Sequence, residues 1–183
     1  MHPAASVLDL LLESQRFDRV PRLGFLQRGI ADPESVAEHS WQVAFLVWVL
    51  GAEVEDLDLP RALELALIHD LAELRTGDLP QLGGAYFPDG AKHTAESRAL
   101  QDLLAPLPEA RRRRGEEYQA GTTREARFVK ACDRLQLLLK VHAYESAGHT
   151  GLDEFWPTPE AFDDGGFAVV RRVHAALRAR RGP

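Results

Sequence analysis

Hydrophobic positions recur along this chain with the period of an α-helix almost from end to end. The series begins at residues 5–17, where Val7, Leu8, Leu11 and Leu12 form a one-sided apolar stripe. Two prolines and two glycines then interrupt the pattern between residues 18 and 33. No stretch alternates like a β-strand over more than four residues. The pattern therefore predicts an all-α protein.

The same periodicity predicts the remaining helices, at residues 34–50, 61–75, 92–108, 108–121, 122–148 and 167–180. Asp32 is the expected N-cap of the second helix, with Pro33 at the first helical position. Thr122 or Thr123 is the expected cap of the long helix. Residues 76–91 form a loop rich in glycine and proline, and loops of this length inside a domain tend to be functional. Residues 151–166 form a second loop. We expect a bundle of about six to eight helices.

The length of 183 residues suits a single domain over residues 1–183, without linkers or repeats. No apolar run reaches the roughly 18–20 residues of a membrane span, because acidic residues from Glu53 onward stop the longest one. The first 17 residues lack the features of a signal peptide. A single cysteine, Cys132, excludes an internal disulfide and a cysteine-based zinc site. We therefore expect a cytoplasmic protein without a membrane partner.

The net charge of −6 argues against a nucleic-acid partner, because nucleic-acid binders are usually basic. Two basic clusters occur, at residues 111–114 and 171–183. We interpret both as solvated helix faces.

Polar residues interrupt three of the apolar helices. His39 opens the segment 34–50, the pair His69 and Asp70 lies within 61–75, and Asp133 lies within 122–148. Burying these groups costs several kcal/mol unless each finds a partner. One metal ion would offset the burial of all four. Two nitrogen and two oxygen ligands suit Mn, Fe, Co, Ni or Zn rather than Ca, and Mg is kept beside them as a candidate.

Each of these residues also has a simpler interpretation. A lone helical histidine is more often a core or surface residue than a metal ligand, and an adjacent His-Asp pair has little specificity. The combination of the three interruptions favours the metal site over three independent core positions.

The ordered pattern of His39, His69-Asp70 and Asp133 resembles the HD-domain superfamily of metal-dependent phosphohydrolases. The segments "PESVAEHSWQVA", "ALIHDLAELRTGDLP" and "EARFVKACDRLQLLLKVHAYE" are similar to the small HD proteins grouped with bacterial 5′-deoxynucleotidases and their eukaryotic relatives. The resemblance extends over residues 19–145. The helix at 167–180 is expected to pack on this core.

The resemblance implies a role for eight residues. One divalent ion would be held by His39, His69, Asp70 and Asp133; the catalytic carboxylates would be Glu73 and Asp78; Arg22 would contact the substrate phosphate; and Phe25 would pack near the sugar, where relatives usually carry tryptophan. Because phenylalanine is the smaller side chain, discrimination between deoxyribose and ribose is expected to be weaker here.

The chemistry of the three other polar residues fits these roles. Glu73 follows Asp70 by three positions and projects from the same helix face one turn on. Asp78 follows Gly77, which permits a sharp exit from a helix. Arg22 can bind a phosphate through two parallel hydrogen bonds. A solvated carboxylate, a turn aspartate and a surface arginine are the respective alternatives.

Four residues close to these positions need an interpretation too. Glu38 is a candidate hydrogen-bond partner of the His39 ring. Lys92, His93 and Glu96 border the long loop, and surface roles are favoured for them over contact with substrate.

The expected function is a divalent-metal-dependent phosphomonoesterase that hydrolyses (deoxy)nucleoside 5′-monophosphates. The metal lowers the pKa of a bound water, which Glu73 positions or deprotonates, and Asp78 shares the proton transfers. One alternative is an HD phosphohydrolase for a nucleoside triphosphate or an alarmone. Another is a non-catalytic nucleotide-binding regulatory module, which should show damage among the ligands or carboxylates. A homodimer is also expected, from the resemblance and from the apolar run Leu135–Val141.

Overall fold

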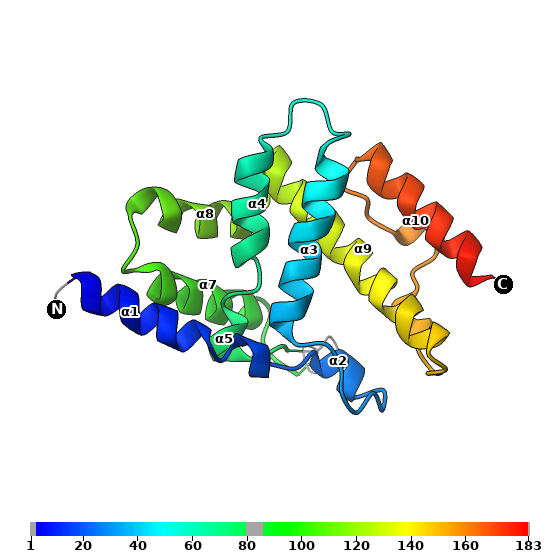
Figure 1. Cartoon of the computed structure of the whole chain (residues 1–183), viewed down its shortest axis with the longest axis horizontal. Helices are drawn as coiled ribbons and strands as arrows, with labels where there is room; N and C mark the ends of the chain where they lie inside the picture. Colours follow the sequence, from blue (N-terminus) through cyan, green and yellow to red (C-terminus); the bar gives the residue numbers. More distant parts are fainter. Residues whose placement is uncertain (1–2, 80–85, 183) are drawn as a thin grey trace. The chain divides into compact units, whose positions relative to one another are not determined.

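The regular secondary structure of the computed structural model, which describes residues 3–79 and 86–182, is helical (Figure 1). Within these residues the only strand-like feature is an isolated bridge between Pro21 and Ser35. The prediction of an all-α bundle is confirmed. The α-helices are α1 (Pro3–Ser14), α2 (Leu23–Leu26), α3 (Val36–Gly51), α4 (Leu59–Ile68), α5 (Glu73–Thr76), α7 (Ala91–Leu104), α8 (Glu109–Ala120), α9 (Arg124–Ser146) and α10 (Ala168–Arg181). Short 3₁₀ turns are η1 (Phe17–Arg19), η2 (Asp153–Phe155) and η3 (Pro159–Ala161).

The chain divides into two compact units, each discontinuous in sequence. The first comprises residues 1–41 and 67–120, and the second comprises residues 42–66 and 121–183. Helices α3 and α4 each run from one unit into the other. A single domain over residues 1–183 stays a prediction.

The first unit is built around the pair α7 and α8, with α5 packed against α7 (Figure 1). Its core includes Ala72, Leu100 and Leu104. Gly115 on α8 is buried, and a Cβ there would lie 3.0 Å and 3.1 Å from the side chains of Leu100 and Leu104. The small residue therefore lets α8 approach α7 closely enough to close this core.

The second unit is organised by the 23-residue helix α9. Thr123 caps it as predicted, because its Oγ1 accepts a hydrogen bond of 3.2 Å from the backbone N–H of Ala126. Helix α10 packs against α9. The ring of Phe167, which precedes α10, meets that of Phe128 edge-on at 4.9 Å. Seven of the ten buried residues on α9 are aliphatic or aromatic, so packing rather than propensity holds this helix.

The start of α3 differs from the prediction. The cap is Ser35, not Asp32, and the helix begins at Val36 rather than at Pro33. The Ser35 hydroxyl accepts from the Glu38 N–H at 3.2 Å, and the Glu38 carboxylate accepts from the Ser35 N–H at 2.7 Å. This reciprocal capping box satisfies two backbone donors at once, which Asp32 would not.

The predicted helix over residues 61–75 is also wrong, because it is interrupted. Helix α4 ends at Ile68, residues 69–72 form turns, and α5 is a single turn that begins at Glu73. Hydrogen bonds between residues three apart hold the interruption, such as Glu73 N–H to Asp70 O at 2.9 Å. His69 and Asp70 therefore lie in a tight turn between two helices.

The other boundaries follow the predictions to within a few residues. Residues 18–33, expected to be irregular, contain η1 and α2, and the loop 151–166 contains η2 and η3. Of the predicted functional loop 76–91, residues 80–85 lie outside the described residues.

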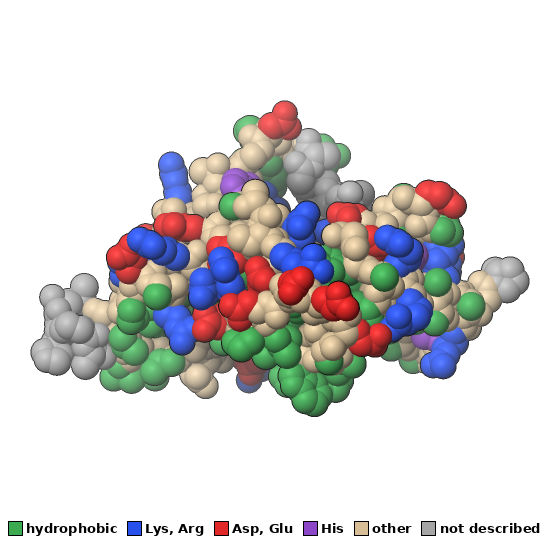
Figure 2. Space-filling view, turned by 90° about the horizontal axis from the view of Figure 1, so that it is seen from above, with side chains coloured by type: hydrophobic (Ala, Val, Ile, Leu, Met, Phe, Trp, Pro, Cys, Tyr) green, Lys and Arg blue, Asp and Glu red, His purple; other side chains and the backbone are tan. Residues whose placement is uncertain are grey.

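Charges of both signs are mixed on the face of the molecule that Figure 2 draws. Figure 2 shows Lys and Arg side chains interspersed with Asp and Glu side chains over one face. None of the described helices combines the length and apolar character that crossing a bilayer requires.

Candidate metal centre and active site

Three of the four predicted metal ligands meet at one point in the first unit. The Nε2 atoms of His39 and His69 lie 3.2 Å apart, and each lies 3.3 Å from Oδ2 of Asp70. Atoms that share one ion through bonds of about 2.1 Å are separated by about 3.0–3.4 Å. The spacing of these three atoms fits a divalent metal ion, and their donor set suits a transition metal.

The interruption between α4 and α5 makes this convergence possible. Adjacent residues on a regular helix point about 100° apart, so neighbouring side chains do not face the same partner. The turn at residues 69–72 brings the ring of His69 and the carboxylate of Asp70 together instead. His39 reaches the same point from the first turn of α3, and its side chain is completely buried.

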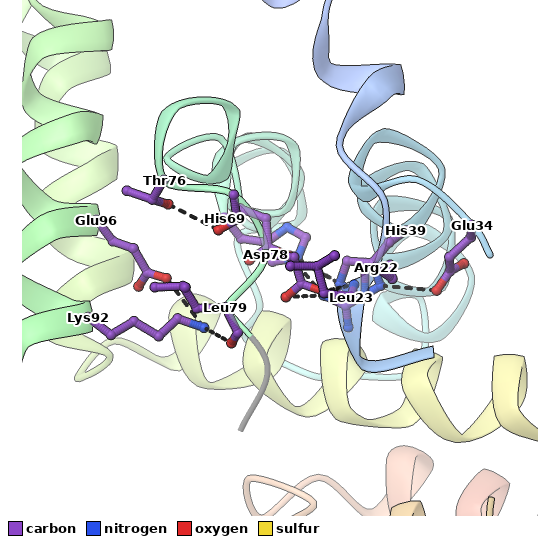
Figure 3. A network of polar contacts seen from close by, with 12 residues as sticks. Arg22, Leu23, Glu34, His39, His69, Thr76, Asp78, Leu79, Lys92 and Glu96 are labelled. Atoms are coloured by element: carbon purple, nitrogen blue, oxygen red, sulfur yellow. Dashed lines mark hydrogen bonds and ion pairs between the residues drawn. The ribbon is translucent and has the colours of Figure 1, made fainter. Parts of the chain in front are cut away.

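A buried carboxylate supports the His39 ring from the side opposite the cluster. Oε1 of Glu34 lies 4.0 Å from Nδ1 of His39 (Figure 3). A negative charge at this atom favours a proton on Nδ1, which directs the Nε2 lone pair toward His69 and Asp70. The prediction gave this role to Glu38, whose carboxylate is used in the capping box. Glu34 was missed because it precedes the helix, where no periodic pattern singles it out.

The electrostatics of the cluster favour a charged Asp70. Burial raises the pKa of its carboxyl, but the neighbouring rings of His69 and His39 hold the pKa well below its usual range. The ring of Tyr118 on α8 packs edge-on against His69 at 5.8 Å and restricts its rotation.

Glu73 is a buried carboxyl beside this cluster. Its side chain is 4% exposed, and its Oε2 atom has no hydrogen-bond partner within residues 3–79 and 86–182. Burial raises the pKa of Glu73 to about 9, with further increases from Asp70 and Asp78 and partial offsets from Arg22 and Lys92. A buried polar atom without a partner is rare in folded proteins. The carboxyl is suited to contact an ion, a water or a substrate.

Asp78 and Arg22 complete the site. Gly77 has a φ of 71°, so the chain leaves α5 by the sharp turn that the glycine predicted. Oδ2 of Asp78 accepts a hydrogen bond of 2.8 Å from the Leu23 N–H, which the sequence did not reveal (Figure 3). Nη1 of Arg22 lies 3.7 Å from Oδ2 of Asp70 and 3.9 Å from Oδ1 of Asp78.

The remaining two predicted residues are Phe25 and Asp133. The Phe25 side chain on α2 is buried, with 1% exposed. Asp133 is half-buried on α9 and belongs to the second unit. Its role as the fourth ligand stays a prediction.

Comparison with known proteins places this geometry in context. The model of the HD domain family matches residues 15–156. The human protein named 5′-deoxynucleotidase HDDC2 is 34% identical over 152 residues, which are 81% of this chain and 72% of that protein. The Vibrio vulnificus protein named 5′-deoxynucleotidase VV1113 is 33% identical over 75% of this chain and 78% of its own length.

Solved structures extend the similarity to nearly the whole fold. A conserved hypothetical protein from Pyrococcus furiosus superposes with a TM-score of 0.83 at 34% identity, covering 94% of this chain and 99% of its own. A predicted metal-dependent phosphohydrolase from Magnetospirillum magnetotacticum superposes with a TM-score of 0.71 at 26% identity, covering 98% and 94% of the two chains.

Proposed function

The chain belongs to the HD domain family, and from this premise we propose that it hydrolyses nucleoside 5′-monophosphates as a divalent-metal-dependent phosphomonoesterase. The observation that carries the proposal is the convergence of His39, His69 and Asp70 beside a buried Glu73. The relatives named 5′-deoxynucleotidase support the substrate class. Deoxyribonucleotides are the preferred form in this proposal.

We assign the metal to His39, His69 and Asp70, with Asp133 of α9 as the fourth ligand. When bound, the ion supplies positive charge that lowers the pKa of water and offsets the charge of the phosphate. The proposed candidates are Co, Mn, Ni, Fe, Zn and Mg, and one divalent ion is bound per chain.

The side chains around the metal ligands bind the phosphate and activate the water. Arg22 binds the phosphate through its guanidinium group and offsets charge that develops on the phosphoryl oxygens. Glu73 positions the attacking water and accepts its proton. The raised pKa of Glu73 belongs to the metal-free chain, and the positive charge of a bound ion would favour the ionised carboxylate that accepts a proton.

Asp78 shares the proton transfers. In the proposed step the water oxygen forms a bond to phosphorus, the bond from phosphorus to O5′ breaks, and O5′ takes up a proton through Asp78 or solvent. The Leu23 N–H fixes the Asp78 carboxylate for this role, 2.8 Å from Oδ2. Because Leu23 directly follows Arg22, the same contact ties the phosphate-binding residue to the end of α5.

A phosphate-release assay tests the proposal. The purified chain is treated with a chelator, dialysed, and assayed with each divalent ion on dAMP, AMP, dATP and an alarmone. We expect release from the monophosphates only, and a loss on the order of 10²–10⁴-fold for Glu73→Gln. Glu55→Gln, at an exposed position, is the matched control and should be unaffected. Release from dATP or the alarmone alone would favour another phosphohydrolase, and no release with any ion would favour a non-catalytic module.

We also propose a homodimer, but on another surface than the sequence suggested. Of the apolar residues in the run 135–141, Leu135, Leu138 and Val141 are buried in the chain itself, and Leu137 and Leu139 are half-buried. Exposed aromatic side chains occur instead on one face of α3, where Trp41 and Trp48 are 63% and 59% exposed. Spacing of three or four residues places Trp41, Phe45 and Trp48 in one row. Light scattering should give twice the mass of 20.4 kDa, and the monomer mass for Trp48→Glu. The cytoplasmic location remains a prediction.

A further inference from the structure

A pocket lies at the start of α7, in the same unit as the cluster. Its volume is about 340 Å³, and it is lined by residues 87–93 and by Glu96. Pockets of about 300–1,000 Å³ are typical of small-molecule sites, which combine an apolar wall with a few polar groups. Phe87 supplies the aromatic wall here, and Lys92, His93 and Glu96 supply polar groups.

Two polar residues of this pocket, Lys92 and Glu96, also interact with residues of the candidate active site. Nζ of Lys92 donates a hydrogen bond of 3.2 Å to the carbonyl of Leu79, the residue after Asp78, and lies 3.4 Å from Oε1 of Glu96 (Figure 3). The charge of Lys92 lowers the pKa of Glu73. The pKa of Glu96 is raised by burial and by the charge of Asp70, and the neighbouring Lys92 partly offsets this increase. Two residues that line the pocket, Lys92 and Glu96, therefore interact through their charges with residues of the candidate active site.

The aromatic wall is accessible. The Phe87 side chain is 52% exposed, whereas Phe25, the residue that the resemblance placed near the sugar, is 1% exposed. A planar base can stack on an accessible ring whatever its identity, because every base has a π-face. The ring of Phe87 is exposed enough for a base to stack on it, whereas the ring of Phe25 is too buried for this.

We propose that the pocket at the start of α7 binds the nucleoside part of the substrate, with the base stacked on Phe87 and the sugar hydroxyls beside Lys92 and Glu96. This inference rests on the proposed function and adds to it the place where the nucleoside binds. A carboxylate accepts hydrogen bonds from hydroxyl groups and an ammonium group donates them, so the pair is suited to a sugar. Stacking alone would give only a weak preference among bases.

The test compares two substrates that differ by the base. Phe87→Ala should reduce kcat/KM for dAMP about 10-fold through KM, since stacking on an aromatic side chain is the interaction removed. Hydrolysis of 2-deoxyribose 5-phosphate, which has no base, should change less than about 2-fold. Tyr86→Ala is the matched control, because Tyr86 is adjacent and 91% exposed but does not line the pocket. Glu96→Gln should change the ratio of kcat/KM for dAMP and AMP.

The outcomes separate this inference from the proposed function. Equal losses on both substrates in Phe87→Ala, or an equal loss in Tyr86→Ala, would overturn the base subsite while leaving the phosphomonoesterase intact. If the wild type hydrolyses neither substrate, the proposed function fails. Calorimetry of dAMP and 2-deoxyribose 5-phosphate binding then tests whether the pocket binds the base. Weaker binding of dAMP alone in Phe87→Ala would support it, and unchanged binding would overturn it.

Discussion

Residues 69–70 and 132–133 look alike in sequence, but the helix is interrupted at the first pair and continuous at the second. Each pair places a polar side chain inside an apolar helical segment. At Asp133 the helix continues, and α9 runs for 23 residues through the position. At His69 the helix stops, and α4 and α5 are separated by the turn that carries His69 and Asp70.

The difference is explained by the number of neighbouring side chains that serve the site: two at residues 69–70, but one at residues 132–133. Cys132 is fully buried and packs as an apolar residue, so a regular helix can orient Asp133 by itself. His69 and Asp70 both direct an atom to within 3.3 Å of the other, which adjacent positions on a regular helix cannot do. A broken helix is therefore expected where two neighbouring residues serve one site.

The largest effect should come from Asp70→Asn. This change keeps the shape of the side chain but removes the negative charge that two histidines face. We expect phosphate release from dAMP to fall on the order of 10³-fold or more, because metal-assisted charge stabilisation contributes several kcal/mol. Asp133→Asn makes the corresponding change in the second region. It should weaken metal binding, and its loss of phosphate release at saturating metal should be smaller than that of Asp70→Asn. Equal and slight effects of both changes would contradict the assignment of the cluster.

A different kind of loss is expected for Glu73→Ala. Turnover should fall on the order of 10²–10⁴-fold if Glu73 is the general base, while the metal content measured by elemental analysis stays near that of the wild type. Near-normal turnover in this variant would transfer the role to Asp78. Loss of the metal would instead make Glu73 a ligand.

Metal removal should lower the melting temperature. An ion that binds only the folded chain stabilises it by roughly 3–4 kcal/mol when present at 100 to 1,000 times its Kd. We expect a chelator to lower the midpoint of the wild type and to have no effect on Asp133→Ala. Identical melting curves of metal-loaded wild type with and without chelator would count against a metal ion that stabilises the folded chain.

Most of the fold could be predicted from the sequence, as could three residues that the structure brings together, His39, His69 and Asp70, and the exceptions have physical causes. Apolar periodicity located α9 and α10 to within a few residues, because packing of one face decides helices of this length. The interruption after Ile68 was hidden, since the tertiary demand on His69 and Asp70 overrides a pattern that reads as helix. Residue order also cannot show Glu34 or the Leu23 N–H as partners of His39 and Asp78. Glu34 lies in an irregular segment, and Leu23 begins α2, a one-turn helix that the pattern did not predict.

The pKa of Glu73 makes the stability of the metal-free chain depend on pH. The folded-state pKa of about 9 lies above the ordinary value of 4.5, so the folded chain binds this proton more tightly than the unfolded chain. The contribution is complete below pH 4.5 and is lost as the pH rises toward 9, at up to about 1.4 kcal/mol per pH unit. Glu73→Gln should remove this slope and exceed the wild type in urea stability at pH 8. Parallel curves of stability against pH for both proteins would show that Glu73 ionises normally.

The smallest effect concerns the sugar. If Phe25 limits the space for a 2′-hydroxyl, exclusion by size alone gives a preference on the order of 10²-fold or less for dAMP over AMP. Phe25→Trp should then widen the preference severalfold. The ratio of kcat/KM for the two nucleotides measures this directly. If the ratio stays constant while the melting temperature falls, Phe25 supports α2 from within the core and is not a wall of the sugar site.

Metal content and activity measured on the same sample test the central claim most directly. Chelated protein is reloaded with one divalent ion at a time, the bound metal is quantified by elemental analysis, and phosphate release from dAMP is followed. The wild type should lose activity with its metal and regain it as the content approaches one ion per chain, and His69→Ala should regain neither. Activity that survives complete removal of the metal, or its absence at full loading with every ion tried, would contradict a metal-dependent phosphomonoesterase.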